Sequence, residues 1–98
     1  MRPPLITRFA PAASRDITEI LDDAEYPVPA DWETELALLV EQLAMFPAMG
    51  RAWPELRPGI RSFVLGSFLV FYRFDATTVE IVRVLHGSRD IEAIFRKN

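Results

Sequence analysis

The sequence contains no cysteine, a single histidine (His86) and a single lysine (Lys97) among its 98 residues. Without cysteine the chain can form no disulfide and offers no thiolate nucleophile or sulfur ligand for a metal. With only one histidine, a zinc site built from protein side chains is not expected, and we predict neither a metal nor a cofactor. These absences argue against disulfide-stabilised secreted domains, thiol enzymes and zinc enzymes.

Long apolar runs are also missing. No stretch approaches the roughly 18 uncharged apolar residues of a membrane-spanning helix. The opening residues 1–11 are interrupted by proline and arginine, unlike a secretory signal. We therefore expect a cytoplasmic protein with no membrane partner. Half of the residues are apolar, enough for one domain with its own core, so we predict a single domain over residues 1–98.

Charge is distributed unevenly along the chain. Residues 1–50 hold three basic and nine acidic side chains, net −6, whereas residues 51–98 hold eight basic and five acidic side chains, net +3. The basic half is compatible with an anionic partner, but the two halves can equally complement each other within one fold. The overall net charge of −3 argues against general nucleic-acid binding, and we expect no direct sequence-specific nucleic-acid partner either.

The first half of the chain has the periodicity of two helices. Residues 5–9 form a short β-prone run, typical of an edge strand, which Pro11 ends. Apolar residues then recur at helical spacing over 12–25 and 31–46, on either side of a proline-rich turn at 27–29. The short connection predicts an antiparallel helical hairpin with one apolar face that a sheet must cover.

Near Gly59 the pattern changes to the alternation of β-strands. Residues 49–59 are expected to form an irregular segment in which Trp53 anchors the edge of the core. Three strands, 60–65, 68–74 and 78–85, follow with connections so tight that neighbours must be antiparallel. Residues 90–95 are expected to form a terminal helical turn. The predicted fold class is α+β, with an N-terminal strand and helical hairpin packed on a mainly antiparallel sheet, in the order β-α-α-β-β-β with a short C-terminal tail.

Each of the three predicted strands carries one arginine: Arg61, Arg73 and Arg83. Since successive side chains on a strand point to opposite faces, the odd-numbered residues of the three strands are expected to share one face, apolar with a cationic centre. Neighbouring guanidiniums repel each other unless anions neutralise them, and these anions are either carboxylates of this chain or carboxylates or phosphates of a partner. We predict that this face meets carboxylates of a partner. The alternative is that the apolar side chains form core beneath the helices, with the arginines at its rim.

Three segments, LRPGIRSF (56–63), LGSFLVFYRFD (65–75) and VEIVRVLHGSRDI (79–91), resemble the RelE/ParE superfamily of toxins from bacterial type II toxin-antitoxin systems. The resemblance is closest to the ParE branch, because the last segment is similar to a ParE-type strand that ends in Arg-x-Leu-His-Gly-x-Arg-Asp. It implies a RelE/ParE-like fold and growth inhibition by poisoning of DNA gyrase, without catalysis by the toxin, and neutralisation by a cognate antitoxin.

An antitoxin segment that wraps such a toxin must bury apolar residues and offer carboxylates to recover the entropy lost on ordering. The residues expected to contact the antitoxin or the target therefore combine apolar and cationic side chains of the predicted sheet and the segment after it. They are Arg61, Phe63, Phe71, Arg73, Ile81, Arg83, His86 and Arg89.

A RelE-like ribonuclease that cuts messenger RNA on the ribosome is the alternative within the superfamily. Its chemistry requires an acid, a base and cations for the phosphate charge. The chain offers His86 as acid, Glu55 as base, and Arg61 and Arg83 as cations. His86 can instead bond to the following turn, and Glu55 can pair with Arg57. The tail lacks the tyrosine or histidine of RelE-like sites, which favours the ParE-like interpretation. A decayed toxin that retains only antitoxin binding is a third possibility.

Overall fold

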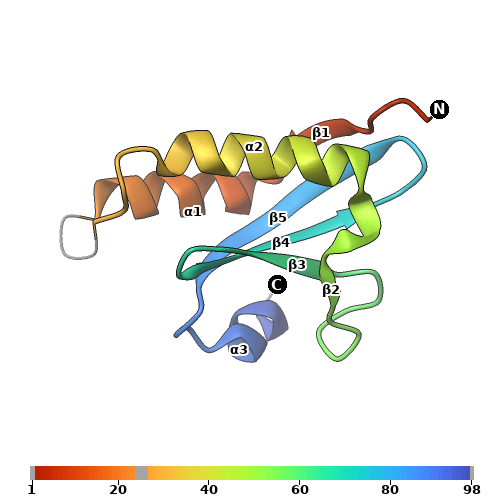
Figure 1. The fold of residues 1–98 in the computed structure, drawn as a ribbon. Helices are drawn as coiled ribbons and strands as arrows, with labels where there is room; N and C mark the ends of the chain where they lie inside the picture. The colour runs from red at the N-terminus through yellow and green to blue at the C-terminus, as the bar shows by residue number, and fades with distance from the viewer. Residues whose placement is uncertain (1, 24–26, 98) are drawn as a thin grey trace.

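The computed structural model describes residues 2–23 and 27–97 (Figure 1). The chain forms β1 (Ile6–Phe9), α1 (Pro11–Asp22), α2 (Trp32–Met45), the short 3-10 helix η1 (Pro47–Met49), β2 (Arg51–Ala52), β3 (Arg61–Leu65), β4 (Phe68–Phe74), β5 (Thr78–His86) and α3 (Ile91–Arg96).

The α+β class and the order of the elements confirm the prediction from sequence. Helix α1 ends earlier than predicted, and residues 24 and 25 of the predicted helix lie outside the described residues. Strand β2 is the one described strand that the sequence does not predict, because two residues are too few to show an alternation. Within the described ranges, no helix is both long and apolar enough to cross a bilayer.

The five strands form one sheet in the order β1-β5-β4-β3-β2. Strand β1 pairs in parallel with the first part of β5, from Thr78 to Ile81, and the other neighbours are antiparallel. Strand β1 is therefore an edge strand, as predicted. The β3–β4 turn places Gly66 at φ +60°, a left-handed conformation that glycine adopts without steric cost.

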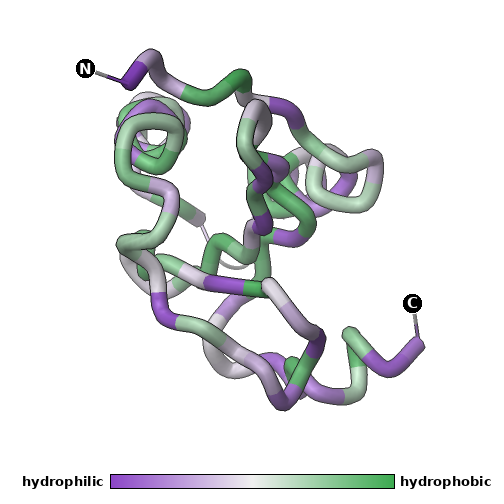
Figure 2. Tube along the Cα trace, turned by 90° about the vertical axis from the view of Figure 1, so that its right-hand side faces the viewer, coloured by the Kyte–Doolittle hydropathy of each residue, from purple (hydrophilic) through white to green (hydrophobic). Residues whose placement is uncertain are grey.

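Two apolar cores lie on opposite faces of this sheet. The helical hairpin covers one face, where Trp32, Leu36 and Leu43 pack against the strands. Helix α3 covers the other face, where Phe95 packs on Phe71 with ring centroids 4.9 Å apart. Figures 1 and 2 show the resulting layers, with the N-terminus on the side of the helical pair, and with α3 and the hydrophilic C-terminal end on the other side of the sheet.

The prediction that the odd-numbered strand residues share one face is wrong. The turn between β3 and β4 contains only two residues, so Leu65 stands opposite Phe68 and Phe63 opposite Val70. Residues directly opposite each other in antiparallel strands point to the same face. Odd-numbered residues of β3 therefore share a face with even-numbered residues of β4, and Arg61 and Phe63 lie on the face opposite to that of Phe71 and Arg73.

A bulge in β5 also places the odd-numbered residues of this strand on both faces of the sheet. Phe71 stands opposite Arg83, but the next residue, Tyr72, stands opposite Ile81, so β5 contains an extra residue at Val82. A bulge of one residue reverses which side chains face which side. Ile81 consequently packs in the core beneath the helical hairpin, whereas Leu85 packs in the core beneath α3.

Candidate functional site

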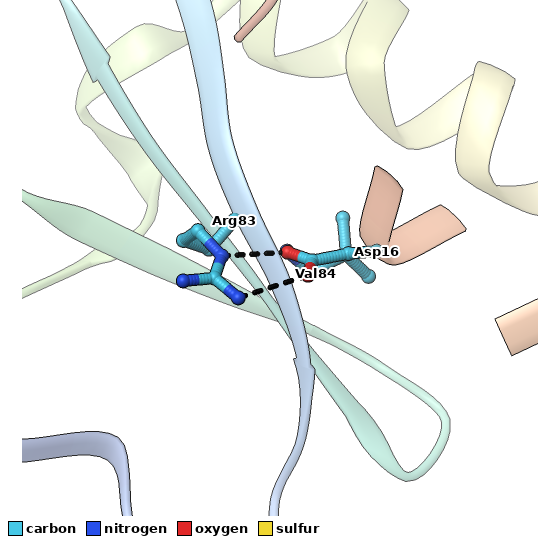
Figure 3. A network of polar contacts seen from close by, with 3 residues as sticks. All are labelled: Asp16, Arg83 and Val84. Carbon is cyan, nitrogen blue, oxygen red and sulfur yellow. Dashed lines mark hydrogen bonds and ion pairs between the residues drawn. The ribbon is translucent and has the colours of Figure 1, made fainter. Parts of the chain in front are cut away.

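The side chain of Arg83 is held by Asp16 of α1 (Figure 3). Nε and Nη2 of Arg83 donate to Oδ2 and Oδ1 of Asp16 at 2.8 and 2.9 Å, and Oδ2 also accepts from the backbone N–H of Val84 at 2.9 Å. Strand β1 accompanies β5 only as far as Ile81, so Asp16 satisfies a donor on the edge that β1 leaves uncovered. These hydrogen bonds raise the pKa of Arg83 above its ordinary value.

The other two strand arginines also have partners within the chain. Arg61 Nη1 donates to the backbone oxygens of Gly50 and Ala48 at 2.8 and 3.2 Å. Arg73 pairs with Glu80 of the neighbouring strand, with Nη2 and Oε1 2.8 Å apart. The predicted shared cationic centre is therefore wrong, because the three guanidiniums are held by three separate sets of acceptors.

The residues proposed for a ribonuclease site are not gathered at one point. Arg61 stands in the row of Tyr72, whereas His86 stands in the row of Phe68. Four residues of strand separate these rows, which corresponds to about 13 Å along the sheet. Glu55, the candidate base, lies on the segment after β2, which pairs with β3 at the Arg61 end. A single phosphate does not span such a distance.

The segment that holds Glu55 is organised around Trp53. Trp53 Nε1 donates to Ser62 Oγ at 2.7 Å, and its ring lies 5.8 Å from that of Phe71. Trp53 thus anchors the edge of the α3-side core, as predicted. The guanidinium of Arg51 stacks 3.8 Å from the Trp53 ring centroid, and Arg51 Nη2 lies 4.0 Å from the Glu55 carboxylate.

Three predicted contact residues belong to the cores. Phe71 and Ile81 are 0% exposed, and Phe63 is partly buried against the hairpin-side core. In this conformation a partner has no access to the side chains of Phe71 and Ile81. Their place follows from the register and the bulge, which turn both residues toward a covering helix.

The two remaining predicted residues, His86 and Arg89, line a cleft of about 410 Å³ between α1 and the end of β5. His86 Nδ1 accepts from the backbone N–H of Ser88 at 3.1 Å and lies 2.7 Å from Ser88 Oγ. Since a backbone N–H can only donate, Nδ1 is the acceptor of the bond from Ser88. The alternative role for His86, bonding to the following turn, is confirmed.

Helix α1 supplies the opposite wall of the cleft. Asp16 and Glu19 of α1 and Asp23, which directly follows the helix, line this wall, and Ile20 and Phe68 contribute apolar surface. None of the site residues that the sequence predicts lies on α1. The signal that was available is the spacing of the three acids, since residues three and four apart share a helix face. In the part of the chain that the structure describes, no group of three or more His, Asp or Glu side chains is arranged to hold a metal ion.

The hairpin of helices on a five-stranded sheet, with β1 parallel to β5, defines the RelE/ParE class of fold. The family described as ParE toxin of the type II toxin-antitoxin system, parDE, matches residues 7–91. Because this match covers most of the sequence, the chain belongs to the ParE toxin family.

Curated relatives agree with this assignment. Toxin ParE1 of Mycobacterium tuberculosis is 35% identical over 89 residues, which cover 86% of this chain and 91% of the relative. Toxin ParE1 of Caulobacter vibrioides is 44% identical over 64 residues, which cover 65% of this chain and 66% of the relative.

Solved structures show the same fold. The RelBE2 toxin-antitoxin complex of Mycobacterium tuberculosis contains a chain that matches with a TM-score of 0.65 and 27% identity, covering 86% of this chain and 99% of that chain. A chain of the chromosomal ParDE system of P. aeruginosa matches with a TM-score of 0.65 and 20% identity, covering 84% of this chain and 95% of that chain.

Proposed function

We propose that this protein is the toxin of a type II toxin-antitoxin pair, that a cognate antitoxin neutralises it, and that it acts in the cytoplasm by poisoning DNA gyrase. The observation that carries the proposal is the match to the ParE toxin family over residues 7–91. The solved relatives described as toxin-antitoxin systems support a protein partner of the same kind.

The placement of the polar residues favours gyrase poisoning over RNA cleavage. Phosphate cleavage by a 2′-hydroxyl needs an acid, a base and cations within hydrogen-bond reach of one phosphate. Here His86 and Arg61 lie four rows apart, and Arg83 is engaged by Asp16. To trap a partner enzyme on its DNA, a toxin needs a binding surface but no acid, base and cations gathered around one phosphate.

Surface exposure narrows the residues that we propose for antitoxin or target contacts. His86 and Arg89 line an open cleft, and the side chain of Arg73 is 64% exposed although it pairs with Glu80. These positions can reach a partner without rearrangement of either core. Arg61 and Arg83 are assigned to the scaffold in this proposal, because both are partly buried and donate hydrogen bonds within the chain, from Nη1 of Arg61 and from Nε and Nη2 of Arg83.

Induced expression in a bacterial host, followed by microscopy and RNA analysis, tests the proposal. Gyrase poisoning predicts filamentous cells with intact transcripts, and growth restored when the protein of the adjacent reading frame is co-expressed. Purified toxin should also increase the amount of cleaved plasmid DNA trapped by gyrase. Cut transcripts would point to the ribonuclease, and normal growth with retained antitoxin binding to a decayed toxin.

A further inference from the structure

We infer that the cleft between α1 and the end of β5 is where side chains of the antitoxin dock, and that it receives an apolar side chain flanked by one basic and one acidic residue. This inference rests on the proposed function, since it names the antitoxin as the occupant. It depends on three features of the cleft: an acidic wall, a basic wall and an apolar floor.

The acidic wall is formed by α1. Of its carboxylates, Asp16 is occupied by Arg83 and Val84. Glu19 is exposed and, among the residues that the structure describes, no salt bridge to it is found. The guanidinium of Arg83 interacts with Glu19 electrostatically, but its hydrogen bonds go to Asp16. A lysine or arginine of a partner lying along this wall would therefore meet a carboxylate that forms no salt bridge within the described residues.

The basic wall follows β5. The side chain of Arg89 is exposed, and within the described ranges it forms no salt bridge. Its backbone N–H donates to the oxygen of His86 at 3.0 Å, which fixes the turn that carries it. An acidic residue of the partner is the complement of this guanidinium, because carboxylates match its planar set of donors.

The floor decides how the partner binds. Ile20 and Phe68 are partly buried and offer apolar surface for one side chain. The backbone N–H of Val84 on the uncovered edge of β5 is already bonded to Asp16 at 2.9 Å. An added strand could not use that donor, so the occupant binds here through side chains rather than by extending the sheet.

Charge selects a protein segment over a nucleic acid as the occupant. A phosphate backbone entering the cleft would approach the carboxylates of Glu19 and Asp23 on the α1 wall. Like charges at such distances repel, whereas a segment with both signs of charge is attracted to both walls. The volume of about 410 Å³ suits a few side chains.

Charge reversals on the two walls test the inference. The probe is the protein encoded by the adjacent reading frame, titrated calorimetrically into the full-length toxin. Glu19→Arg and Arg89→Glu should each weaken binding by about tenfold or more, which corresponds to about 1.4 kcal/mol. Glu41→Arg on α2 and Arg96→Glu on α3, which reverse exposed charges outside the cleft, should change the affinity by less than about threefold. Thermal melts of all four variants confirm that the fold is retained.

The outcomes separate this inference from the proposed function. If the wild-type protein binds its neighbour and both cleft variants bind equally well, the cleft is not the docking site, but the toxin-antitoxin assignment stands. The same conclusion follows if the control variants lose as much affinity as the cleft variants. A wild-type protein that neither inhibits growth nor binds the neighbour would overturn both. Losses confined to the cleft variants, larger at low salt than at high salt, support the inference.

Discussion

Asp16 and Arg83 lie 67 residues apart in sequence and form a two-point ion pair, with Arg83 Nε 2.8 Å from Asp16 Oδ2. The Asp16 side chain is 9% exposed and that of Arg83 18% exposed, so water competes weakly for either group. The same carboxylate also accepts a hydrogen bond from the backbone N–H of Val84, on the edge of β5 that β1 does not cover. The pair therefore fastens α1 to the sheet, and its contribution is to the fold of the isolated toxin.

Asp16→Ala should destabilise the protein by about 2–4 kcal/mol, because it leaves the buried N–H of Val84 without an acceptor and Arg83 without its counter-ion. The measurement is urea unfolding followed by circular dichroism. Asp22→Ala serves as the control, since Asp22 is exposed on the same helix and should change the unfolding free energy by less than about 0.5 kcal/mol. Equal losses in both variants would show that the effect belongs to the helix rather than to the pair.

Arg83→Ala tests the same pair from the other side. On the strand pattern alone, removing an arginine from a cationic cluster should cost the isolated domain little. Because Arg83 binds Asp16, its removal instead leaves the buried Asp16 carboxylate without a counter-ion. We expect the free energy of unfolding to fall by more than about 1 kcal/mol. An unfolding free energy equal to that of the wild-type protein would restore the interpretation of Arg83 as a residue held ready for a partner.

Gly50→Ala should destabilise the protein by about 2 kcal/mol or more, because a methyl group at this position would collide with the hydroxyl of Tyr72 and lie 2.7 Å from the backbone oxygen of Ser62. The Tyr72 hydroxyl accepts from the Gly50 N–H at 2.9 Å and donates to the oxygen of Pro47 at 2.7 Å, so it is not free to move away. Gly87→Ala is the matched control, since the added carbon would lie at an ordinary 3.5 Å from its nearest neighbour. The midpoint of thermal unfolding should fall for the first variant and stay nearly constant for the second.

The turn between β4 and β5 should weaken at acidic pH. The backbone N–H groups of Thr77 and Thr78 donate to the Asp75 carboxylate at 2.9 and 2.8 Å, and these bonds lower the pKa of Asp75. A lowered pKa in the folded state means that the stabilisation is present above the ordinary pKa of about 4 and is lost as the pH falls through the folded value. Asp75→Asn should therefore reduce the melting temperature at pH 7 and have a smaller effect near pH 2. A difference that does not depend on pH would contradict the role of the carboxylate charge.

The sequence predicts the elements of this fold well because their signals are local. Apolar spacing identifies both helices, and alternation identifies β3, β4 and β5 to within one residue at each end. The face of the sheet to which each strand residue points is not a local property, because it depends on the register in which the strands pair. The two-residue turn at 66–67 does imply that Leu65 pairs with Phe68, and this signal was available in the sequence. The bulge at Val82 leaves no comparable mark.

The residues of the candidate site also differ in whether a local sequence signal predicts them. The sequence predicts His86 and Arg89 as contact residues because they belong to a motif that resembles the ParE branch, and both line the cleft. It does not predict the acidic wall of the cleft, because the contact of α1 with β5 joins residues from opposite ends of the chain. Arg83 with Asp16 is the clearest case: strand alternation places the arginine, but only the packing of α1 on the uncovered edge of β5 supplies its partner.

His86→Ala should leave growth inhibition largely intact. Its Nδ1 is engaged by Ser88 and its ring packs against Phe68 at 5.3 Å between centroids, so the side chain supports the turn rather than reaching for a phosphate. A general acid contributes typically ~10²- to 10⁴-fold to a reaction rate, and a ribonuclease that used His86 would lose most of its activity. The measurement is colony survival after induced expression, with the amount of protein and its melting temperature determined in parallel. Loss of toxicity at unchanged melting temperature, together with cut transcripts in cells that express the wild-type protein, would contradict the non-catalytic role and revive the ribonuclease alternative.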